Sequence, residues 1–357
     1  MNRIVSFLLP SLGDKPGGGY KIVLEYANRL NKRGLAINLV YPLCVKNKGL
    51  VMNIVGTLFR LIRFTFQRYS AKSWFDLSSN VQECVVWKLS DKYLPKSDCY
   101  IATAVGTAID LEKCKIPTSK KMYFIQGYED WACSIEDLEK TFTYGMTNIV
   151  VSKWLKKYLD QKGIKSYLVR NAFDFEYFTL KKPIIERDKY HISLLYSKNP
   201  IKGTQYALEA IKKLKLEYPQ IQVSAFGIYN RPTELESWIT YYQKPNKEVH
   251  NQIYNTSSIF IAPSINEGWG LTVGEAMICG NAVVCTCNKG HLEMALDMTT
   301  ALLCQVKDAQ AIYDKVKILI ENDSLRFRIA SNGLDNIHKF TWEKSVEDFH
   351  RIIIKKE

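Results

Sequence analysis

Two glutamates in one glycine-rich stretch, residues 263–280, have the residue type and the spacing of a ligand-binding site. Glu267 and Glu275 lie eight residues apart, and the glycines between them exclude one continuous helix. We expect Glu267 on a loop that leaves a strand, and Glu275 in the first turn of a helix capped by Thr272. Both would then point toward the carboxyl end of a parallel sheet, where open α/β folds bind ligands. A capping box accounts for Glu275 alone, but it leaves Glu267 unexplained.

A run of three glycines, Gly17-Gly18-Gly19, follows the first strand-like segment and precedes an amphipathic helix. Glycines let backbone amides approach a ligand closely, and the N-terminus of a helix favours anions. The run lacks the G-x-G-x-x-G spacing of a dinucleotide fingerprint, and the next strand ends at Tyr41-Pro42 without the required acid. The glycines therefore indicate either an anion site or a flexible loop, and we expect no NAD-type cofactor.

The nine cysteines do not have the pattern of a disulfide framework, because their number is odd and they are spread over a long chain. The closest pair, Cys285 and Cys287, lies in an apolar strand-like run without a histidine in series. We interpret both as buried thiols and not as zinc ligands. The cysteines therefore indicate no zinc site of their own, and they predict a reducing, cytoplasmic compartment.

Strand and helix signals alternate along the chain, which predicts parallel sheets covered by helices. Strands are expected at 3–9, 35–41, 99–104, 121–125, 147–151 and 166–170, and after a connector at 172–190 again at 191–197, 221–227, 258–262 and 282–286. Helices are expected from about Gly203, at 273–279, near 290–296, and two or three times at the C-terminus. The expected fold class is α/β, with two tandem Rossmann-like domains that face a cleft.

The length and charge of the chain limit the possibilities further. A chain of 357 residues fits two domains better than one core, and 49 basic against 36 acidic residues give a net charge of +13. Residues 1–180 hold 26 of the basic and 16 of the acidic residues. No stretch reaches the ~18 apolar residues of a membrane span, and we expect no signal peptide. The excess charge predicts a polyanionic partner.

The stretch 41–75 concentrates this charge beside aliphatic and aromatic residues, and it contains no acid. Its six cations are Lys46, Lys48, Arg60, Arg63, Arg68 and Lys72. This composition predicts an interfacial amphipathic helix that docks on an anionic membrane surface, with Arg60, Arg63, Arg68 and Lys72 as the docking residues. The alternative is a helix packed on the first domain with solvated charges. No nucleic-acid partner is expected, because no binding motif accompanies the charge.

The Glu-x7-Glu block, with Glu275-Ala276-Met277 and Gly280 after it, resembles the signature of the retaining glycosyltransferases of family 4, which have the GT-B fold. The resemblance covers nearly the whole chain. It continues in order at Gly17-Gly18-Gly19, Asn171-Ala172-Phe173-Asp174 with Phe178, Lys202-Gly203, Phe226-Gly227, Gly290, Glu293 and Phe340-Thr341-Trp342. The resemblance implies an N-terminal acceptor-side domain at 1–172, a nucleotide-sugar domain at 173–340 and a C-terminal helix, 341–357, that packs toward the first domain.

This resemblance also implies roles for single residues. Glu275 would accept hydrogen bonds from the ribose hydroxyls of a nucleotide sugar, and Glu267 would hold hydroxyls of the transferred sugar. Lys202 would neutralise charge on the leaving diphosphate without a metal ion. The implied donor-binding residues are Glu275, Gly18, Gly19, Gly227, Gly268, Gly270, Leu271 and Thr272. Glu267, Lys202 and Lys198 are the implied catalytic residues.

Two departures from the family pattern affect this interpretation. The usual arginine five residues before the lysine is Ser197 here, and Lys198 is its candidate substitute, although an ammonium cannot form the bidentate contacts of a guanidinium. The first domain has no histidine. Gln126, Glu129 and Asp130 are the acceptor-side candidates, and either acid would orient the acceptor hydroxyl or take its proton. A solvated loop acid, or a leaving phosphate that acts as the base, is the alternative.

The function that this resemblance implies is transfer of a sugar from a nucleotide sugar to a glycan or a lipid-linked glycan, with retention of configuration. The expected place is the cytoplasmic face of a membrane, where the enzyme would be peripheral. One alternative is another GT-B enzyme, such as a sugar-nucleotide epimerase or a phosphorylase. The other is a catalytically silent relative that binds a glycan or scaffolds a pathway.

Overall fold

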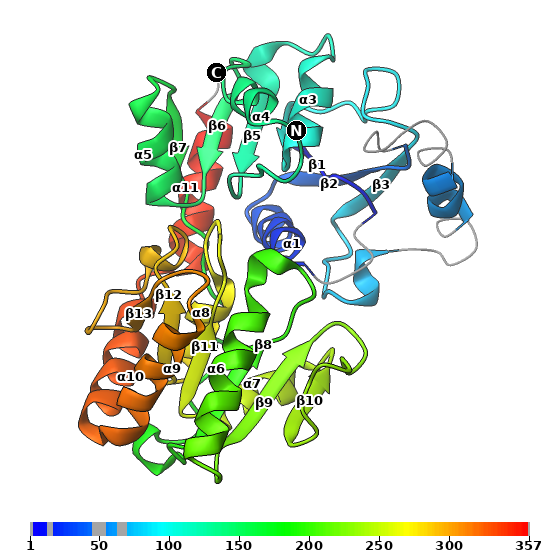
Figure 1. Cartoon of the computed structure of the whole chain (residues 1–357). Helices are drawn as coiled ribbons and strands as arrows, with labels where there is room; N and C mark the ends of the chain where they lie inside the picture. Colours follow the sequence, from blue (N-terminus) through cyan, green and yellow to red (C-terminus); the bar gives the residue numbers. More distant parts are fainter. Residues whose placement is uncertain (1–2, 13–16, 45–54, 63–69, 356–357) are drawn as a thin grey trace. The chain divides into compact units, whose positions relative to one another are not determined.

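The computed structural model describes residues 3–12, 17–44, 55–62 and 70–355. The chain divides into two compact units (Figure 1). The first unit comprises Met1–Asn171 together with Glu343–Glu357, and the second comprises Ala172–Trp342. The end of the chain therefore belongs to the same unit as its beginning.

The first unit is built on a parallel sheet whose described strands have the order β3-β2-β1-β4-β5-β6-β7. The strands are β1 (Ile4–Leu8), β2 (Ala36–Pro42), β3 (Gln82–Val86), β4 (Cys99–Ala102), β5 (Lys121–Ile125), β6 (Thr147–Val150) and β7 (Ser166–Leu168). The helices are α1 (Gly18–Lys32), α3 (Val105–Glu112), α4 (Ile135–Thr141), α5 (Lys153–Gln161) and α11 (Trp342–Ile354), with 3-10 turns η1 (Ala71–Ser73) and η2 (Thr118–Lys120).

The sequence of this unit explains its burial. The strands β4 and β5 are buried along their whole length, and their sequences CYIA and KMYFI are almost continuously apolar, as expected for a parallel sheet covered on both faces. The last helix, α11, completes the core through Phe349. Its ring centroid lies 4.7 Å from that of Tyr26 on α1 and 5.1 Å from that of Phe124 on β5. These aromatic contacts hold α11 on the first unit.

The second unit has its own parallel sheet, with the order β10-β9-β8-β11-β12-β13. The strands are β8 (His191–Leu195), β9 (Gln222–Gly227), β10 (Ile239–Gln243), β11 (Ile259–Ala262), β12 (Ala282–Thr286) and β13 (Leu302–Cys304). The helices are α6 (Thr204–Glu217), α7 (Lys247–Thr256), α8 (Leu271–Ile278), α9 (Ala309–Glu321) and α10 (Asp323–Ile337), with 3-10 turns η3 (Ile184–Glu186), η4 (Pro200–Lys202) and η5 (His291–Glu293).

The strand order of the second unit creates a switch point between β8 and β11. Strands that follow β8 in the chain are added on one side, up to β10, and those from β11 onward are added on the other. Neighbouring loops that leave β8 and β11 therefore turn in opposite directions, and open α/β sheets bind their ligands at the carboxyl end of such a switch point. In the first unit, β1 and β4 have the same relationship.

The structure confirms the predicted α/β class with two Rossmann-like sheets, but it corrects several elements. The strands β3, β10 and β13 were not predicted, because β3 and β10 are half-exposed edge strands and β13 has only three residues. The helix predicted near 290–296 is wrong, since only the single turn η5 forms there. All nine cysteines are free thiols, and Cys285 is buried as predicted, but the prediction that Cys287 is buried is wrong, because it lies just past the end of β12 and is only partly buried. Among the described residues, no helix has both the length and the apolar character needed to cross a bilayer.

Candidate active site

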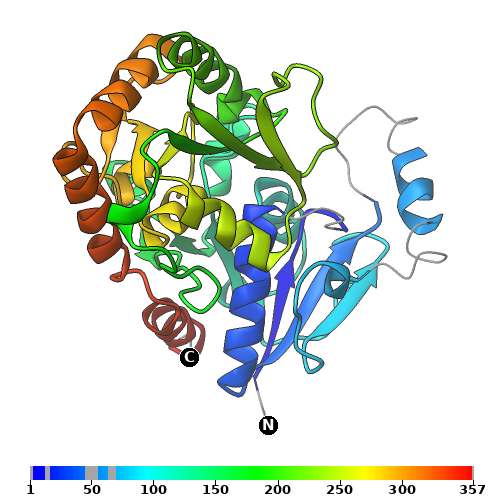
Figure 2. The same ribbon diagram turned by 90° about the horizontal axis from the view of Figure 1, so that it is seen from below.

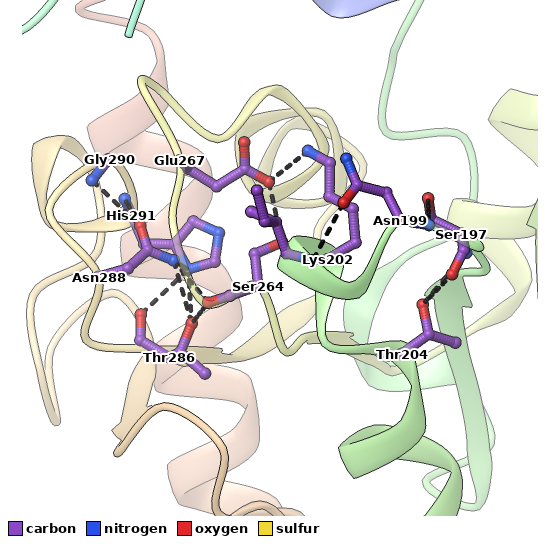
Figure 3. Close-up of polar contacts among 11 residues, drawn as sticks. Ser197, Asn199, Lys202, Thr204, Ser264, Glu267, Thr286, Asn288, Gly290 and His291 are labelled. Carbon is purple, nitrogen blue, oxygen red and sulfur yellow. Dashed lines mark hydrogen bonds and ion pairs between the residues drawn. The ribbon is translucent and has the colours of Figure 1, made fainter. Parts of the chain in front are cut away.

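An ion pair lies at the switch point of the second unit (Figure 3). Lys202 ends η4 in the loop after β8, and Glu267 lies in the loop after β11. Nζ of Lys202 donates to Oε1 of Glu267 at 2.6 Å, and Oγ of Ser264 donates to the same oxygen at 2.8 Å. Burial alone would raise the pKa of Glu267, but Lys202, His291 and the two hydrogen bonds outweigh it and hold that pKa below its ordinary value. Glu267 is therefore a carboxylate at neutral pH.

Glycine at position 203 brings the two loops together. Gly203 has φ +63°, and a Cβ there would lie 2.1 Å from the carbonyl oxygen of Pro263, so a side chain would force the loops apart. The amide of Ile265 donates to the carbonyl of Ile201 at 2.7 Å, which joins the loops directly beside Lys202. The position of the ion pair is therefore fixed by backbone contacts and not only by the two side chains.

The helix α8 starts beside Glu267 and differs from the prediction at its N-terminus. Gly270, with φ +95°, is the N-cap, so the predicted cap at Thr272 is wrong and no side chain caps the helix. No acidic residue occupies the first turn. The amides of Leu271 and Thr272 lie at the start of the helix, where no turn precedes them to accept their hydrogen bonds. This end of α8 thus has the donors and the dipole that favour an anion.

Glu275 lies one turn deeper in α8 than predicted. The helix begins at Leu271, so Glu275 is in its second turn, where its side chain is buried. The hydroxyl of Tyr254 donates to its Oε2 at 3.4 Å. Burial and the nearby Glu275 carboxylate raise the pKa of Tyr254 well above its ordinary value, so the phenol keeps its proton. Glu275 is therefore held beneath the start of α8 with a neutral hydroxyl partner.

The catalytic candidate Lys198 and the donor-binding candidate Gly227 have contacts of another kind. The ammonium of Lys198 lies 5.3 Å from the centroid of the Tyr229 ring, so the structure does not bring it to the Lys202–Glu267 pair. At Gly227, the end of β9, a Cβ would lie 2.6 Å from the carbonyl oxygen of Tyr196. Glycine is thus required there by packing.

The acceptor-side candidates of the first unit gather after β1, β4 and β5. A Cβ on Gly19 would lie 3.5 Å from the side-chain amide of Gln126, whose Nε2 donates to the carbonyl of Thr103 at 3.4 Å. Oε2 of Glu129 accepts from the amide of Val105, the first residue of α3, at 2.9 Å. Burial raises the pKa of Glu129 above its ordinary value. By contrast, Asp130 and Gly18 are exposed.

The membrane-docking candidates are only partly described. Residues 55–62 are helical and stand out from the rest of the first unit in both views (Figures 1 and 2). Large apolar side chains on this segment are exposed: Val55, Leu58, Phe59, Leu61 and Ile62. Arg60 donates to the carbonyl of Leu43 and to Oγ1 of Thr57, so its guanidinium is already engaged. Lys72 is exposed in η1, whereas Arg63 and Arg68 lie outside the described residues.

Sequence reasoning missed a polar network beneath Glu267. Oδ1 of Asn288 accepts from the amides of Gly290 and His291, and its Nδ2 donates to the carbonyl of Ser264 at 2.9 Å (Figure 3). The only signal in the sequence was the Asn-x-Gly-His order after a strand. In the described part of the chain, no three His, Cys, Asp or Glu residues group as metal ligands do.

The sequence and the fold of this chain are similar to those of known proteins. Residues 179–335 match the family described as Glycosyl transferases group 1. An uncharacterized glycosyltransferase of Methanocaldococcus jannaschii is 27% identical over 224 residues, which span 59% of this chain and 61% of the relative. The matched region is thus only part of that curated relative.

Two solved structures share the fold of the whole chain. HepE of Anabaena, solved in complex with UDP-glucose, has a TM-score of 0.69 and 14% identity, with 99% of this chain and 98% of that chain covered. TarM has a TM-score of 0.75 and 11% identity, with 99% of each chain covered. At such identities the likeness establishes the fold alone.

Proposed function

Because residues 179–335 match the family described as Glycosyl transferases group 1 and the chain has a GT-B fold, we propose that the protein is a retaining glycosyltransferase. Its donor is a nucleotide sugar, and its acceptor is a glycan or a lipid-linked glycan. The observation that carries the proposal is the Lys202–Glu267 pair at the switch point between β8 and β11, beside the uncapped start of α8. A cation, a carboxylate and free helix amides at one sheet end match the parts of a nucleotide sugar.

Each part of the donor has a partner of suitable chemistry in this proposal. The amides at the start of α8 and Lys202 bind the diphosphate, and Glu275 binds the ribose hydroxyls. When the bond from the anomeric carbon to the phosphate oxygen breaks, negative charge builds on the diphosphate, and Lys202 stabilises it. A charge-assisted contact of this kind contributes about 1.5–3 kcal/mol.

Glu267 is the proposed partner of the transferred sugar. Lys202 and Ser264 both donate to Oε1, and within the described residues Oε2 has no hydrogen bond. A carboxylate oxygen that is free to accept is suited to a sugar hydroxyl. The 2.6 Å contact with Lys202 places this oxygen beside the group that binds the diphosphate, to which the sugar is attached.

The first unit supplies the proposed acceptor site. Gln126 and Glu129 present an amide and a carboxylate at the carboxyl ends of β1, β4 and β5, near the glycines that precede α1. Burial raises the pKa of Glu129, which makes its carboxylate a stronger base for the acceptor hydroxyl. Asp130 is the weaker candidate, because its exposure leaves it fully solvated.

The test is a panel of nucleotide sugars incubated with the protein in EDTA, followed by NMR of the released sugar. UDP-glucose comes first, because HepE was solved with it. The proposal predicts slow hydrolysis of one donor, with the anomeric configuration of the donor retained and no loss of rate in EDTA. A catalytically silent relative would bind the nucleotide without hydrolysis. The observation in favour of this alternative is that Lys198, the candidate substitute for the family arginine, lies on the Tyr229 ring.

We also propose that residues 55–62 bring the enzyme to the cytoplasmic face of an anionic membrane. Leu58 and Phe59 are 56% and 63% exposed, and each nearby cation contributes about 1 kcal/mol at an anionic surface. The wild-type protein is expected to sediment with phosphatidylglycerol vesicles, whereas the Leu58→Glu, Phe59→Glu double variant is expected to stay in the supernatant. The matched control is Leu216→Glu, which changes an 86% exposed leucine of α6. Equal sedimentation of both variants would contradict this proposal.

A further inference from the structure

The imidazole of His291 is buried beneath the donor site, and the proposed mechanism has not used it. Its side chain is 0% exposed. Nδ1 lies 3.0 Å from the carbonyl oxygen of Thr286 and 2.9 Å from Nδ2 of Asn288. Figure 3 shows the ring below Glu267, with these contacts on the side of the Thr286–Asn288 loop. A titratable ring is thus packed against the residues that hold Glu267.

The contacts of Nδ1 are compatible with either neutral tautomer of the ring. The Asn288 amide is oriented by its own contacts, since Oδ1 accepts from two backbone amides and Nδ2 must face His291. A bare Nδ1 can therefore accept from Asn288, whereas a protonated Nδ1 can donate to the Thr286 carbonyl. Nδ1 therefore has a partner whether the ring hydrogen is on Nδ1 or on Nε2.

The other nitrogen, Nε2, is buried and has no hydrogen-bond partner within the described part of the chain. An unpaired buried nitrogen is unfavourable, so it indicates a partner that is absent from the free protein. Since Nδ1 faces Thr286 and Asn288, Nε2 lies on the opposite side of the ring. There a Cβ on Gly270 would lie 2.8 Å from Cδ2 and 3.6 Å from Nε2.

Glu267 is the acidic side chain next to this face of the ring. A Cβ on Gly290, the residue before His291, would lie 2.7 Å from Cβ of Glu267. The backbone next to His291 is therefore in contact with Glu267. The polar network joins them as well, from His291 through Asn288 and Ser264 to Glu267. Burial lowers the pKa of His291 below its ordinary value, while the Glu267 carboxylate opposes this shift and Lys202 adds to it.

We propose that His291 is a positioning residue of the donor site, whose Nε2–H donates to Glu267 when a donor diphosphate draws Lys202 away. In the free protein, Glu267 is held by Lys202 and Ser264. A bound diphosphate competes for the ammonium of Lys202. Glu267 would then lose its strongest partner at the moment when it has to hold the sugar. His291 replaces that partner and keeps the carboxylate against the sugar hydroxyls. This inference rests on the proposed glycosyl transfer.

The test compares two amides that each replace one ring nitrogen. In His291→Asn the side-chain amide reaches only the position of Nδ1, whereas in His291→Gln it reaches the position of Nε2. Calorimetric titration with UDP and UDP-glucose is expected to give a Kd for UDP-glucose about tenfold weaker in the Asn variant and near wild type in the Gln variant. The Kd for UDP is expected to weaken less in the Asn variant, because UDP draws Lys202 away but has no sugar for Glu267 to hold. The Asn substitution is expected to have no further effect in a Glu267→Gln background.

Other outcomes identify which claim fails. Equal UDP-glucose affinity in the Asn variant and the wild type would overturn the role of Nε2, and so would a loss of equal size in the Glu267→Gln background. If wild type binds no nucleotide of the panel, the proposed function itself fails, and this inference with it. Should the Asn variant unfold, the Nε2 resonance of ¹⁵N-histidine-labelled wild type is the readout. It is expected to shift on addition of UDP-glucose and also of UDP, because both carry the diphosphate that draws Lys202 away, and a resonance unchanged by either would overturn the proposal.

Discussion

Nζ of Lys202 lies 2.6 Å from Oε1 of Glu267, although 65 residues separate the two in the sequence. The contact arises because β8 and β11 are hydrogen-bonded parallel neighbours, so the loops that follow them both begin at the carboxyl end of the sheet. Each residue neutralises the other while no ligand is bound. Under the proposed function, a diphosphate at this carboxyl end of the sheet would take the ammonium and leave the carboxylate for the sugar.

Glu267→Gln tests the role of the carboxylate toward the sugar. The variant keeps the shape of the side chain but loses its charge, so we expect kcat to fall about 100-fold. The affinity for UDP should change less than kcat, because UDP lacks the sugar that Glu267 is proposed to hold. Steady-state kinetics and calorimetry give both numbers. Glu236→Gln is the control, since Glu236 forms an exposed ion pair with Lys212 in the same unit. Unchanged kcat in Glu267→Gln would remove this residue from the mechanism.

Glu275→Ala and Thr272→Ala separate binding from helix capping. Because Gly270 is the N-cap of α8, Thr272→Ala should change the free energy of unfolding by less than about 0.5 kcal/mol. Glu275→Ala should weaken UDP binding by about tenfold or more, because a ribose would lose its carboxylate partner. Urea unfolding and calorimetry measure the two effects. Full UDP affinity in folded Glu275→Ala would show that the residue is structural.

The sequence was sufficient for the alternating α/β pattern, because the buried strands of both sheets are apolar runs between helices. It was insufficient for β10, whose half-exposed residues pack on one edge only. The predicted cap at Thr272 failed because Gly270 adopts the left-handed conformation two residues earlier and starts the helix itself. His291 has no recognisable local pattern, because its partners Thr286, Asn288 and Gly270 gather around it only in the folded unit.

Glu129 gives a pH dependence of stability with a defined sign. Burial raises its pKa above the ordinary 4.5, so the folded protein holds the proton more tightly than the unfolded chain. Its stabilising contribution is full below the ordinary pKa and is lost as the pH rises through the raised pKa. Glu129→Gln does not titrate. We therefore expect the stability of the variant relative to wild type to increase from about pH 4 to about pH 7 in urea unfolding. A constant difference would contradict burial of this carboxyl group.

Arg187 tests the connector that begins the second unit. Its guanidinium donates to the backbone carbonyls of Lys182, Tyr254, Ser257 and Cys279. Burial lowers its pKa to about 10, so it remains charged at neutral pH. Arg187→Met leaves these buried carbonyls without their donor and should cost about 3 kcal/mol of unfolding free energy. The exposed Arg328→Met is the control. Equal stability of both variants would show that the carbonyls find other donors.

Calorimetric titration of Lys202→Met with UDP tests the donor site most directly. Lys212→Met is the matched control, because Lys212 also pairs with a glutamate, Glu236, at 2.8 Å in the same unit. The expected result is a Kd for UDP at least about tenfold weaker in Lys202→Met and unchanged in Lys212→Met. If the folded Lys202→Met protein binds UDP as tightly as wild type, the ion pair at the β8–β11 switch point is not the diphosphate site.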